Sequence, residues 1–263
     1  MPLILVILSI IVISFLIYMF IEASTLRVRK IKFSNKEDAL KLMHITDVHI
    51  EKMVISKDKI RKIILSESPD AIILSGDYIE RLSSVDKFLK FLDYITGICP
   101  IYAVFGNHDY KTYDYDIDRL NALKEAIENK GVTFLLDESI IINSYNLLGI
   151  KDFKRGYPNI EKALNSLDKN LKTVAFSHNP DILTILPEKS VDYMFCGHYH
   201  GGQIRLPFNM EFLTLRNDIL CKKEIRRGGK NIKGIELYIS NGIGNVLVPM
   251  RFLSPPEILI YYV

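Results

Sequence analysis

The fold is decided by the stretch Ile101-Tyr102-Ala103-Val104-Phe105-Gly106-Asn107-His108-Asp109, an apolar run that stops abruptly at an amide, an imidazole and a carboxylate. The run has the length and β-branched content of a buried strand. Gly, Asn and Asp are ordinary turn residues, so the segment alone could be a strand followed by a plain turn. It gains meaning because four other apolar runs in this chain end in the same kind of side chains.

These four runs also stop at potential metal ligands. They are followed by Asp47-Val48-His49 after residues 42–46, Gly76-Asp77 after 71–75, Ser177-His178-Asn179 after 174–176, and Gly197-His198-Tyr199-His200 after 193–196. Five of the six histidines of the chain fall in the five motifs, which packing alone would not produce. We therefore interpret the five motifs as parts of one site.

The spacing of the first three motifs predicts how they come together. Asp47, Asp77 and Asn107 are each 30 residues apart, about the length of one strand–helix–strand unit. Amphipathic stretches lie between the runs, and a further strand is expected at 147–150. If the strands are parallel, all three side chains emerge at the carboxyl edge of the sheet, where open α/β folds place their ligands.

The mixture of ligand types points to a borderline metal. Carboxylate, amide and imidazole groups suit Mn, Fe or Zn better than Ca or thiolate-preferring ions. Asp47 and His49 can reach one ion only if the backbone turns after the strand, whereas His198 and His200 could each serve a different ion. Asp77 is the candidate to lie between two cations, which would hold them about 3.5–4 Å apart.

The order Asp-x-His, Gly-Asp, Gly-Asn-His-Asp, His and Gly-His-x-His resembles the calcineurin-like metallophosphoesterases from about residue 40 to 263. The resemblance implies an α/β fold with two facing mixed sheets flanked by helices, a four-layer α/β/β/α sandwich. It also implies a dinuclear centre at the sheet edge, holding divalent or trivalent Mn, Fe or Zn, with Mn favoured. A hydroxide activated by two metals would then attack the phosphorus.

The resemblance also implies a role for each motif residue. His108 would contact the substrate phosphate and protonate the leaving oxygen, and Asp109 would orient His108. One metal would be bound by Asp47, His49, Asp77 and His200, and the second by Asp77, Asn107, His178 and His198.

Two later segments resemble one branch of that family, the small membrane-associated bacterial phosphodiesterases. They are 197–207, which contains the Gly-His-x-His motif, and 240–258. Some relatives in this branch act on lipid headgroup intermediates, including UDP-diacylglucosamine pyrophosphates. Tyr199 stands where this branch more often has Thr, which puts the shape of the pocket in doubt but not metal binding.

The N-terminus is the clearest break in composition. Residues 2–21 carry no charge, and about 20 apolar residues in a helix cover the roughly 30 Å hydrocarbon core of a bilayer. No Lys or Arg precedes the run and no clear cleavage site follows it, which favours a retained anchor over a signal peptide. We predict a transmembrane anchor at 1–22, a basic juxtamembrane segment at 23–39 and a phosphoesterase domain at 40–263. Five basic residues in that segment favour a cytoplasmic domain: Arg27, Arg29, Lys30, Lys32 and Lys36.

The sequence thus predicts a membrane-anchored phosphoesterase that cleaves a phosphodiester or pyrophosphate. Its substrate would be a phosphorylated small molecule or a lipid headgroup, such as a phospholipid or a nucleotide-linked lipid intermediate. The alternatives are a nuclease or cyclic-nucleotide phosphodiesterase and, in another class, a non-catalytic metal-binding scaffold of the same fold. A net charge of +3 does not favour nucleic acid, and no obligate protein partner is implied. Three widely spaced cysteines indicate neither a disulfide framework nor a cysteine zinc site.

Overall fold

Two six-stranded sheets face each other in the computed structural model, which describes residues 2–34, 39–215 and 217–263. The first sheet has the order β1 (Arg27–Lys32), β12 (Glu257–Tyr262), β2 (Lys41–Ile45), β3 (Ala71–Leu74), β4 (Ile101–Ala103) and β5 (Val132–Phe134). The second has the order β10 (Gly228–Ile232), β11 (Ile235–Ile239), β9 (Tyr193–Cys196), β8 (Lys172–Phe176), β7 (Tyr145–Gly149) and β6 (Glu138–Ile142). Both sheets mix parallel and antiparallel pairs, as predicted.

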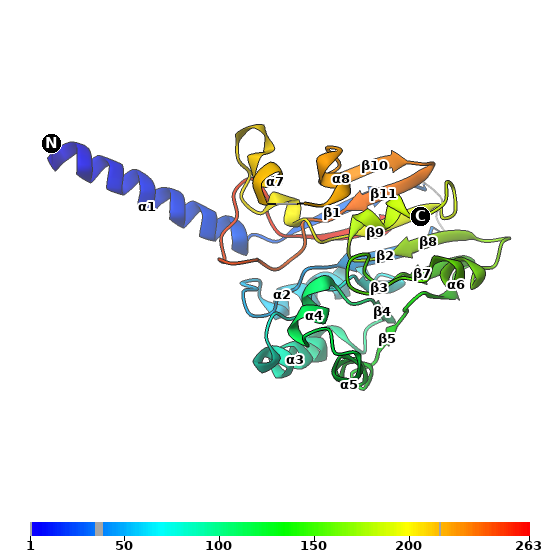
Figure 1. Cartoon of the computed structure of the whole chain (residues 1–263). Helices are drawn as coiled ribbons and strands as arrows, with labels where there is room; N and C mark the ends of the chain where they lie inside the picture. The colour runs from blue at the N-terminus through cyan, green and yellow to red at the C-terminus, as the bar shows by residue number, and fades with distance from the viewer. Residues whose placement is uncertain (1, 35–38, 216) are drawn as a thin grey trace.

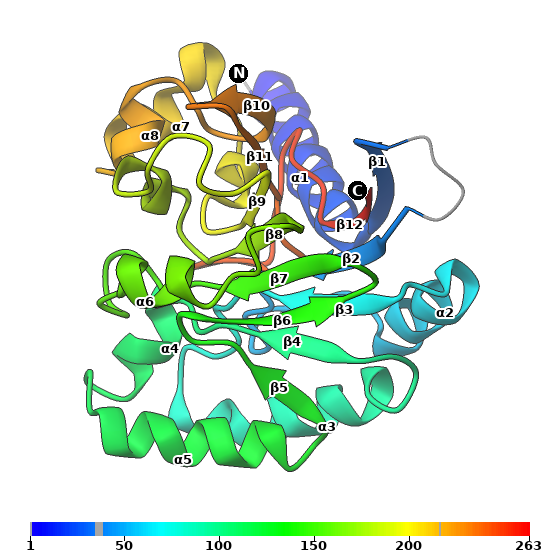
Figure 2. The same cartoon turned by 90° about the vertical axis from the view of Figure 1, so that its right-hand side faces the viewer.

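Helices cover the outer face of each sheet, so the predicted four layers are confirmed (Figures 1 and 2). The first sheet is covered by α2 (Lys57–Glu67), α3 (Val85–Ile95) and α5 (Ile117–Glu128). The second is covered by α6 (Ile160–Asn165), η2 (Pro180–Thr184), α7 (Met210–Leu215) and α8 (Ile219–Lys222). A third apolar cluster fills the space between the sheets, where Phe195 stacks on Tyr261 with ring centroids 3.6 Å apart.

The parallel pairing of β2, β3 and β4 brings the first motifs to one edge. Ile45 pairs with Leu74, and Leu74 pairs with Ala103, so the three strands stop at the same level. The short helix α4 (Asn107–Thr112) begins directly after β4. The expectation that Asp47, Asp77 and Asn107 emerge at a common carboxyl edge is therefore met.

The N-terminal helix α1 (Pro2–Ser24) projects away from the body (Figure 1). Its residues Leu3–Ser24 have a mean hydropathy of 3.1 and are long and apolar enough to cross a membrane, while only 6% of the most apolar window is buried. The last turns contact the body: the N–H of Arg251 donates to the carbonyl of Met19 at 3.0 Å. An aromatic contact joins Phe252 to Phe15, with centroids 5.1 Å apart.

The sequence assigned residues 23–39 to a juxtamembrane segment, but part of it belongs to the first sheet. Residues Arg27–Lys32 form the edge strand β1, which pairs in parallel with β12. Two of its basic side chains have carboxylate partners, since Arg29 lies 3.4 Å from Glu257 and Lys30 lies 2.9 Å from Glu67. Lys36 lies outside the described residues. The periodicity that marks a core strand is absent from this exposed edge, which is why the sequence did not predict it.

Candidate metal centre

The backbone at the ends of the strands is held in an uncommon conformation. Five predicted ligands have left-handed φ angles: Asp47 (51°), His49 (37°), Asp77 (55°), His198 (73°) and His200 (51°). Such a conformation costs about 1–2 kcal/mol per non-glycine residue and persists only where the surroundings impose it. It turns each side chain inward from its strand end. The backbone turn that Asp47 and His49 needed to reach one ion is therefore present.

Two glycines allow these loops to approach each other. A Cβ atom on Gly106 would lie 2.2 Å from Oδ1 of Asp77, and one on Gly197 would lie 2.2 Å from Oδ2 of Asp47. Any side chain at either position would displace a carboxylate of the site. This explains in steric terms why the central motif and the Gly-His-x-His motif each begin with glycine.

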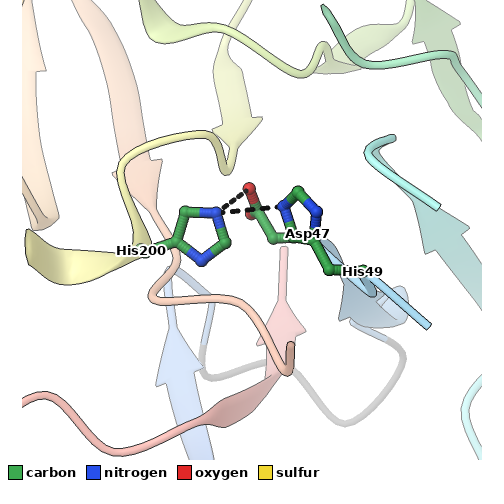
Figure 3. Close-up of side chains that lie close together, drawn as sticks. All are labelled: Asp47, His49 and His200. Carbon is green, nitrogen blue, oxygen red and sulfur yellow. Dashed lines mark hydrogen bonds and ion pairs between the residues drawn. The ribbon is translucent and has the colours of Figure 1, made fainter. Parts of the chain in front are cut away.

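A first cluster consists of Asp47, His49 and His200, which are all buried (Figure 3). Nε2 of His49 and Nε2 of His200 lie 3.2 Å apart, and Nε2 of His200 lies 3.2 Å from Oδ1 of Asp47. The first two residues follow β2, and the third follows β9 in the opposite sheet. The cluster therefore joins the two sheets at their common edge.

A second cluster consists of Asp77, His178 and His198, with Asn107 beside it. Nε2 of His178 lies 3.1 Å from Oδ2 of Asp77, 3.1 Å from Oδ1 of Asn107 and 3.0 Å from Nδ1 of His198. His198 and His200 thus contribute to different clusters, one of the options that their spacing left open.

Asp77 lies between the clusters. Its Oδ2 atom is 3.6 Å from Nε2 of His49 in the first cluster and 3.1 Å from Nε2 of His178 in the second. Its Oδ1 atom accepts the N–H of His108 at 2.8 Å. All seven predicted metal ligands are brought together by these contacts, and Asp77 occupies the position expected of a bridging carboxylate.

The geometry suits cations. In each cluster two imidazole nitrogens face each other, at 3.2 Å and 3.0 Å, an arrangement that requires a proton or a cation between their lone pairs. Burial alone would lower the pKa of His178, but the negative charge and hydrogen bond of Asp77 outweigh burial and raise it to about 10. The buried site therefore strongly favours positive charge, and oxygen and nitrogen donors of this kind suit borderline divalent ions.

Three further residues, which the sequence did not identify, hold the imidazoles of the site. The carbonyl of Ser75 accepts the Nδ1–H group of His178 at 2.9 Å, so Nε2 is the nitrogen that would offer its lone pair to a cation when the ring gives up its second proton. Oδ1 of Asp218 lies 3.2 Å from Nε2 of His198, and Oε1 of Glu80 lies 3.0 Å from Nδ1 of His49. Such partners fix the orientation of metal-binding histidines.

Glu80 has the charge state that this role needs. Burial opposes its ionisation, but the imidazole of His49 and the ammonium of Lys52 outweigh burial and lower the pKa of Glu80 to about 2. Glu80 follows Asp77 by three residues, so closeness to a motif could have suggested it. Asp218 follows no strand-end motif, and nothing in its sequence surroundings marks it.

His108 borders the site, and the carboxylate of Asp109 accepts hydrogen bonds from the backbone around it. The ring of His108 packs edge-on against the ring of His49, with centroids 5.0 Å apart. The carboxylate of Asp109 accepts backbone N–H groups from Gly106 at 2.8 Å, Asp77 at 2.9 Å and Tyr78 at 2.8 Å. Through these contacts Asp109 ties the β3 loop to the turn that carries His108.

A cavity of about 550 Å³ adjoins the centre at His108 and His200. Its other walls are mainly apolar and include Tyr199, Ile204, Leu206, Phe212, Val246 and Val248. Tyr199 is buried, and its hydroxyl donates to Oδ1 of Asp181 at 3.1 Å. The cavity can therefore accept an apolar group next to the candidate metal centre.

The sequence model of the calcineurin-like phosphoesterase family matches residues 40–202. The chain is 29% identical to the uncharacterized metallophosphoesterase YkoQ of Bacillus subtilis, over 85% of this chain and 83% of YkoQ. It is 27% identical to the UDP-2,3-diacylglucosamine pyrophosphatase LpxG of Chlamydia muridarum, over 84% and 82% of the two chains. It is also 27% identical to the phosphodiesterase YaeI of Escherichia coli, over 86% and 83%.

The solved structures show a likeness of fold alone. The protein TT1561 of Thermus thermophilus aligns with a TM-score of 0.50 at 10% identity, over 78% of this chain and 90% of that one. The two-sheet core described above is therefore an architecture found in other proteins.

Proposed function

This chain belongs to the calcineurin-like phosphoesterase family and is a phosphoester hydrolase, and we propose that it is a membrane-anchored enzyme that cleaves a phosphodiester or pyrophosphate in a lipid-linked substrate. The observation that carries the proposal is the position of Asp77 between two histidine clusters, beside a largely apolar cavity. A site for two divalent ions supports phosphoester hydrolysis, and the cavity supports a substrate with an apolar part.

We assign the proposed ligands to two metal ions according to the two clusters in which they lie. Asp47, His49 and His200 would hold one ion, Asn107, His178 and His198 the other, and Asp77 both. The ions would neutralise phosphate oxygens and lower the pKa of a bound water toward about 7. Imidazole, amide and carboxylate ligands together suit Mn, Fe or Zn, and among these the resemblance to the family favours Mn.

We assign the protonation of the leaving oxygen to His108. Its ring lies at the boundary between the candidate metal centre and the cavity, next to His49. From there it would hydrogen-bond the substrate phosphate and protonate the oxygen that leaves, a contribution of about 10²–10⁴-fold to the rate. Asp109 would be a positioning residue, since it fixes the backbone that carries His108.

The name of one relative favours a lipid-linked substrate, and the name of another favours a phosphodiester. LpxG is named for a diacylglucosamine linked to UDP, and YaeI for a phosphodiester. The helix α1 would keep this chain at a membrane, where such substrates reside. We place the domain at 40–263 on the cytoplasmic face, with an anchor at 1–22 and the 23–39 segment, including β1, between them.

A substrate panel tests the proposal. The full chain, purified in detergent and loaded with Mn²⁺, should hydrolyse a nitrophenyl phosphodiester and a nucleotide-linked diacyl lipid in mixed micelles. A nitrophenyl monoester, a cyclic nucleotide and single-stranded DNA serve as competing substrates, and the Asp77→Asn variant controls for contaminating hydrolases. Faster cleavage of the cyclic nucleotide or DNA than of the lipid would reject the lipid-linked substrate in favour of the alternatives.

A labelling experiment tests the orientation. In a Cys99→Ser background, a Tyr157→Cys variant carries a reactive thiol at a position that is 81% exposed. Cys196 and Cys221 are buried and should not react. A membrane-impermeant maleimide should label the variant in lysed cells but not in intact cells. Labelling in intact cells would place the domain outside the cytoplasm.

A further inference from the structure

Several bulky apolar side chains that line the cavity, or lie on the same segments as its lining residues, are exposed to solvent. Leu206 and Val248 line its wall and are 44% and 43% exposed, Leu247 lines it and is 85% exposed, and Phe208, two residues after Leu206, is 90% exposed. Leu253 is 52% exposed on the same loop as Leu247. We call these five residues the apolar rim: Leu206, Phe208, Leu247, Val248 and Leu253.

Hydrogen bonds hold the loop that carries part of the rim in one conformation. The side-chain amide of Gln203 donates to the carbonyls of Val246 at 2.8 Å, Val248 at 3.1 Å and Met250 at 3.2 Å, and its oxygen accepts the N–H of Val246 at 2.7 Å. A β-bridge joins Ile204 to Phe252. One polar side chain thus fixes the loop that presents Leu247 and Val248, and the bridge joins that loop to the segment that precedes Phe208.

The conformation of the rim is costly in water. Phe208, Leu247 and Leu253 have left-handed φ angles of 57°, 58° and 55°. A bulky residue rarely adopts this conformation, and these three also expose apolar surface. The cost of the exposed apolar surface is removed if an apolar phase covers these side chains.

The contacts between this loop and the helix α1 indicate which apolar phase could cover the rim. The N–H of Leu253 donates to Oε2 of Glu22 at 2.9 Å, and the ring of Phe252 contacts Phe15 and Tyr18. Phe15 precedes the end of α1 at Ser24 by nine residues, or about 13 Å along the helix axis. The loop therefore runs alongside the last turns of the apolar helix, as the red loop beside the base of α1 shows in Figure 1.

We propose that the apolar rim inserts into the bilayer that α1 crosses, so that the cavity at His108 opens at the membrane surface. This inference rests on the membrane anchor of the proposed function. The partner of this surface is the bilayer itself. A lipid-linked substrate would then enter the cavity sideways from the membrane, with its phosphate at the candidate metal centre and its apolar part still in lipid. We choose the bilayer over a soluble protein as the partner because the rim adjoins α1. A soluble protein bound there would have to share the space beside the helix with lipid.

Tryptophan fluorescence can test the insertion without background, because the chain contains no tryptophan. The full chain would be reconstituted in phosphatidylcholine–phosphatidylglycerol vesicles whose acyl chains carry bromine, a contact quencher. Leu247→Trp and Phe208→Trp should lose about half of their fluorescence or more relative to unbrominated vesicles, since interfacial side chains reach about 5–10 Å into the headgroup–acyl boundary. Ile141→Trp, on β6 and 61% exposed, should not change.

An Ile11→Trp variant in α1 separates the two proposals. Quenching at position 11 without quenching at 208 and 247 would overturn the insertion of the rim while leaving the anchor in place. No quenching at position 11 would overturn the anchor and, with it, the inference. Equal quenching at position 141 would show that the body lies on the bilayer in another orientation, which also contradicts the proposal.

Activity gives the second measurement. The double variant Phe208→Ser/Leu253→Ser changes rim residues that do not line the cavity. It should lose at least about tenfold in kcat/KM on a nucleotide-linked lipid in vesicles, since removing the burial of even one apolar side chain corresponds to about that factor. Hydrolysis of a soluble nitrophenyl phosphodiester should stay within about twofold. Equal losses on both substrates would contradict lateral entry, whereas absence of hydrolysis by the parent enzyme would refute the proposed function and leave the quenching result standing.

Discussion

Replacing Asp218 should weaken metal binding without touching a proposed ligand. Oδ1 of Asp218 lies 3.2 Å from Nε2 of His198, whose Nδ1 lies 3.0 Å from Nε2 of His178. The carboxylate keeps the proton of His198 on Nε2, so that the Nδ1 lone pair faces the second cluster. Loss of such a partner typically lowers metal affinity about 10–100-fold, or about 1.4–2.7 kcal/mol. We expect that loss in Asp218→Ala and a smaller one in Asp218→Asn, whose amide oxygen can still accept a hydrogen bond from the Nε2–H group of His198.

The control must account for a second contact of Asp218. Lys154 forms an ion pair with the same carboxylate, and its side chain is 38% exposed, so this pair contributes little. Lys154→Met removes the ion pair but leaves the partner of His198 in place. Mn²⁺ affinity would be measured by isothermal titration of the metal-free full chain and by the Mn²⁺ dependence of phosphodiester hydrolysis. Parental affinity in Asp218→Ala, or an equal loss in Lys154→Met, would refute the reasoning.

Three further predictions concern single residues. Asp77→Ala should lose both ions and all measurable hydrolysis, because its carboxylate contacts both clusters; elemental analysis that found two ions per chain would contradict this. His108→Gln should lower kcat about 10²–10⁴-fold with the metal content unchanged, as the same analysis and a rate assay would show, and an unchanged kcat would remove it from proton transfer. Burial, and to a smaller extent the charge of His178, lower the pKa of His44 from 6.5 to about 3. Between these two pH values His44 binds a proton in the unfolded chain but not in the folded one. The free energy of unfolding therefore falls as the pH is lowered from 6.5 toward 3. Urea unfolding at several pH values should show a shallower acid loss in His44→Gln, by up to about 1.4 kcal/mol per pH unit, and parallel curves would contradict it.

The sequence predicted the core of the fold because each motif interrupts a recognisable apolar run. The runs before Asp77 and Asn107 became the adjacent parallel strands β3 and β4, and this pairing alone brings the two motifs to one edge. The order of the motifs then identified the family, whose architecture supplied the second sheet. Neither step required knowledge of side-chain positions.

What the sequence could not predict depends on contacts between distant segments. Asp218 is 20 residues from His198 in sequence, and only the packing of α8 on the second sheet brings them together. The backbone N–H groups that the carboxylate of Asp109 accepts come from three separate positions, Gly106, Asp77 and Tyr78, and no local pattern in the sequence specifies them. The left-handed backbone at Asp47 and His200 is likewise imposed by tertiary contacts, since neither residue type requires it.

The contacts of α1 bear on how an anchored enzyme of this kind is oriented. The carbonyl of Met19 accepts the N–H of Arg251, and Ser254, three residues later, donates from its hydroxyl to the carbonyl of His200 at 3.0 Å. The guanidinium of Arg251 is fully buried and donates to backbone carbonyls that include that of Asn241 at 3.0 Å. Hydrogen bonds through residues 251–254 therefore connect the helix to the backbone of a proposed metal ligand. If α1 spans the membrane as proposed, the same contacts set the height of the candidate metal centre above the bilayer, and the helix belongs to the substrate-binding unit as well as to the anchor.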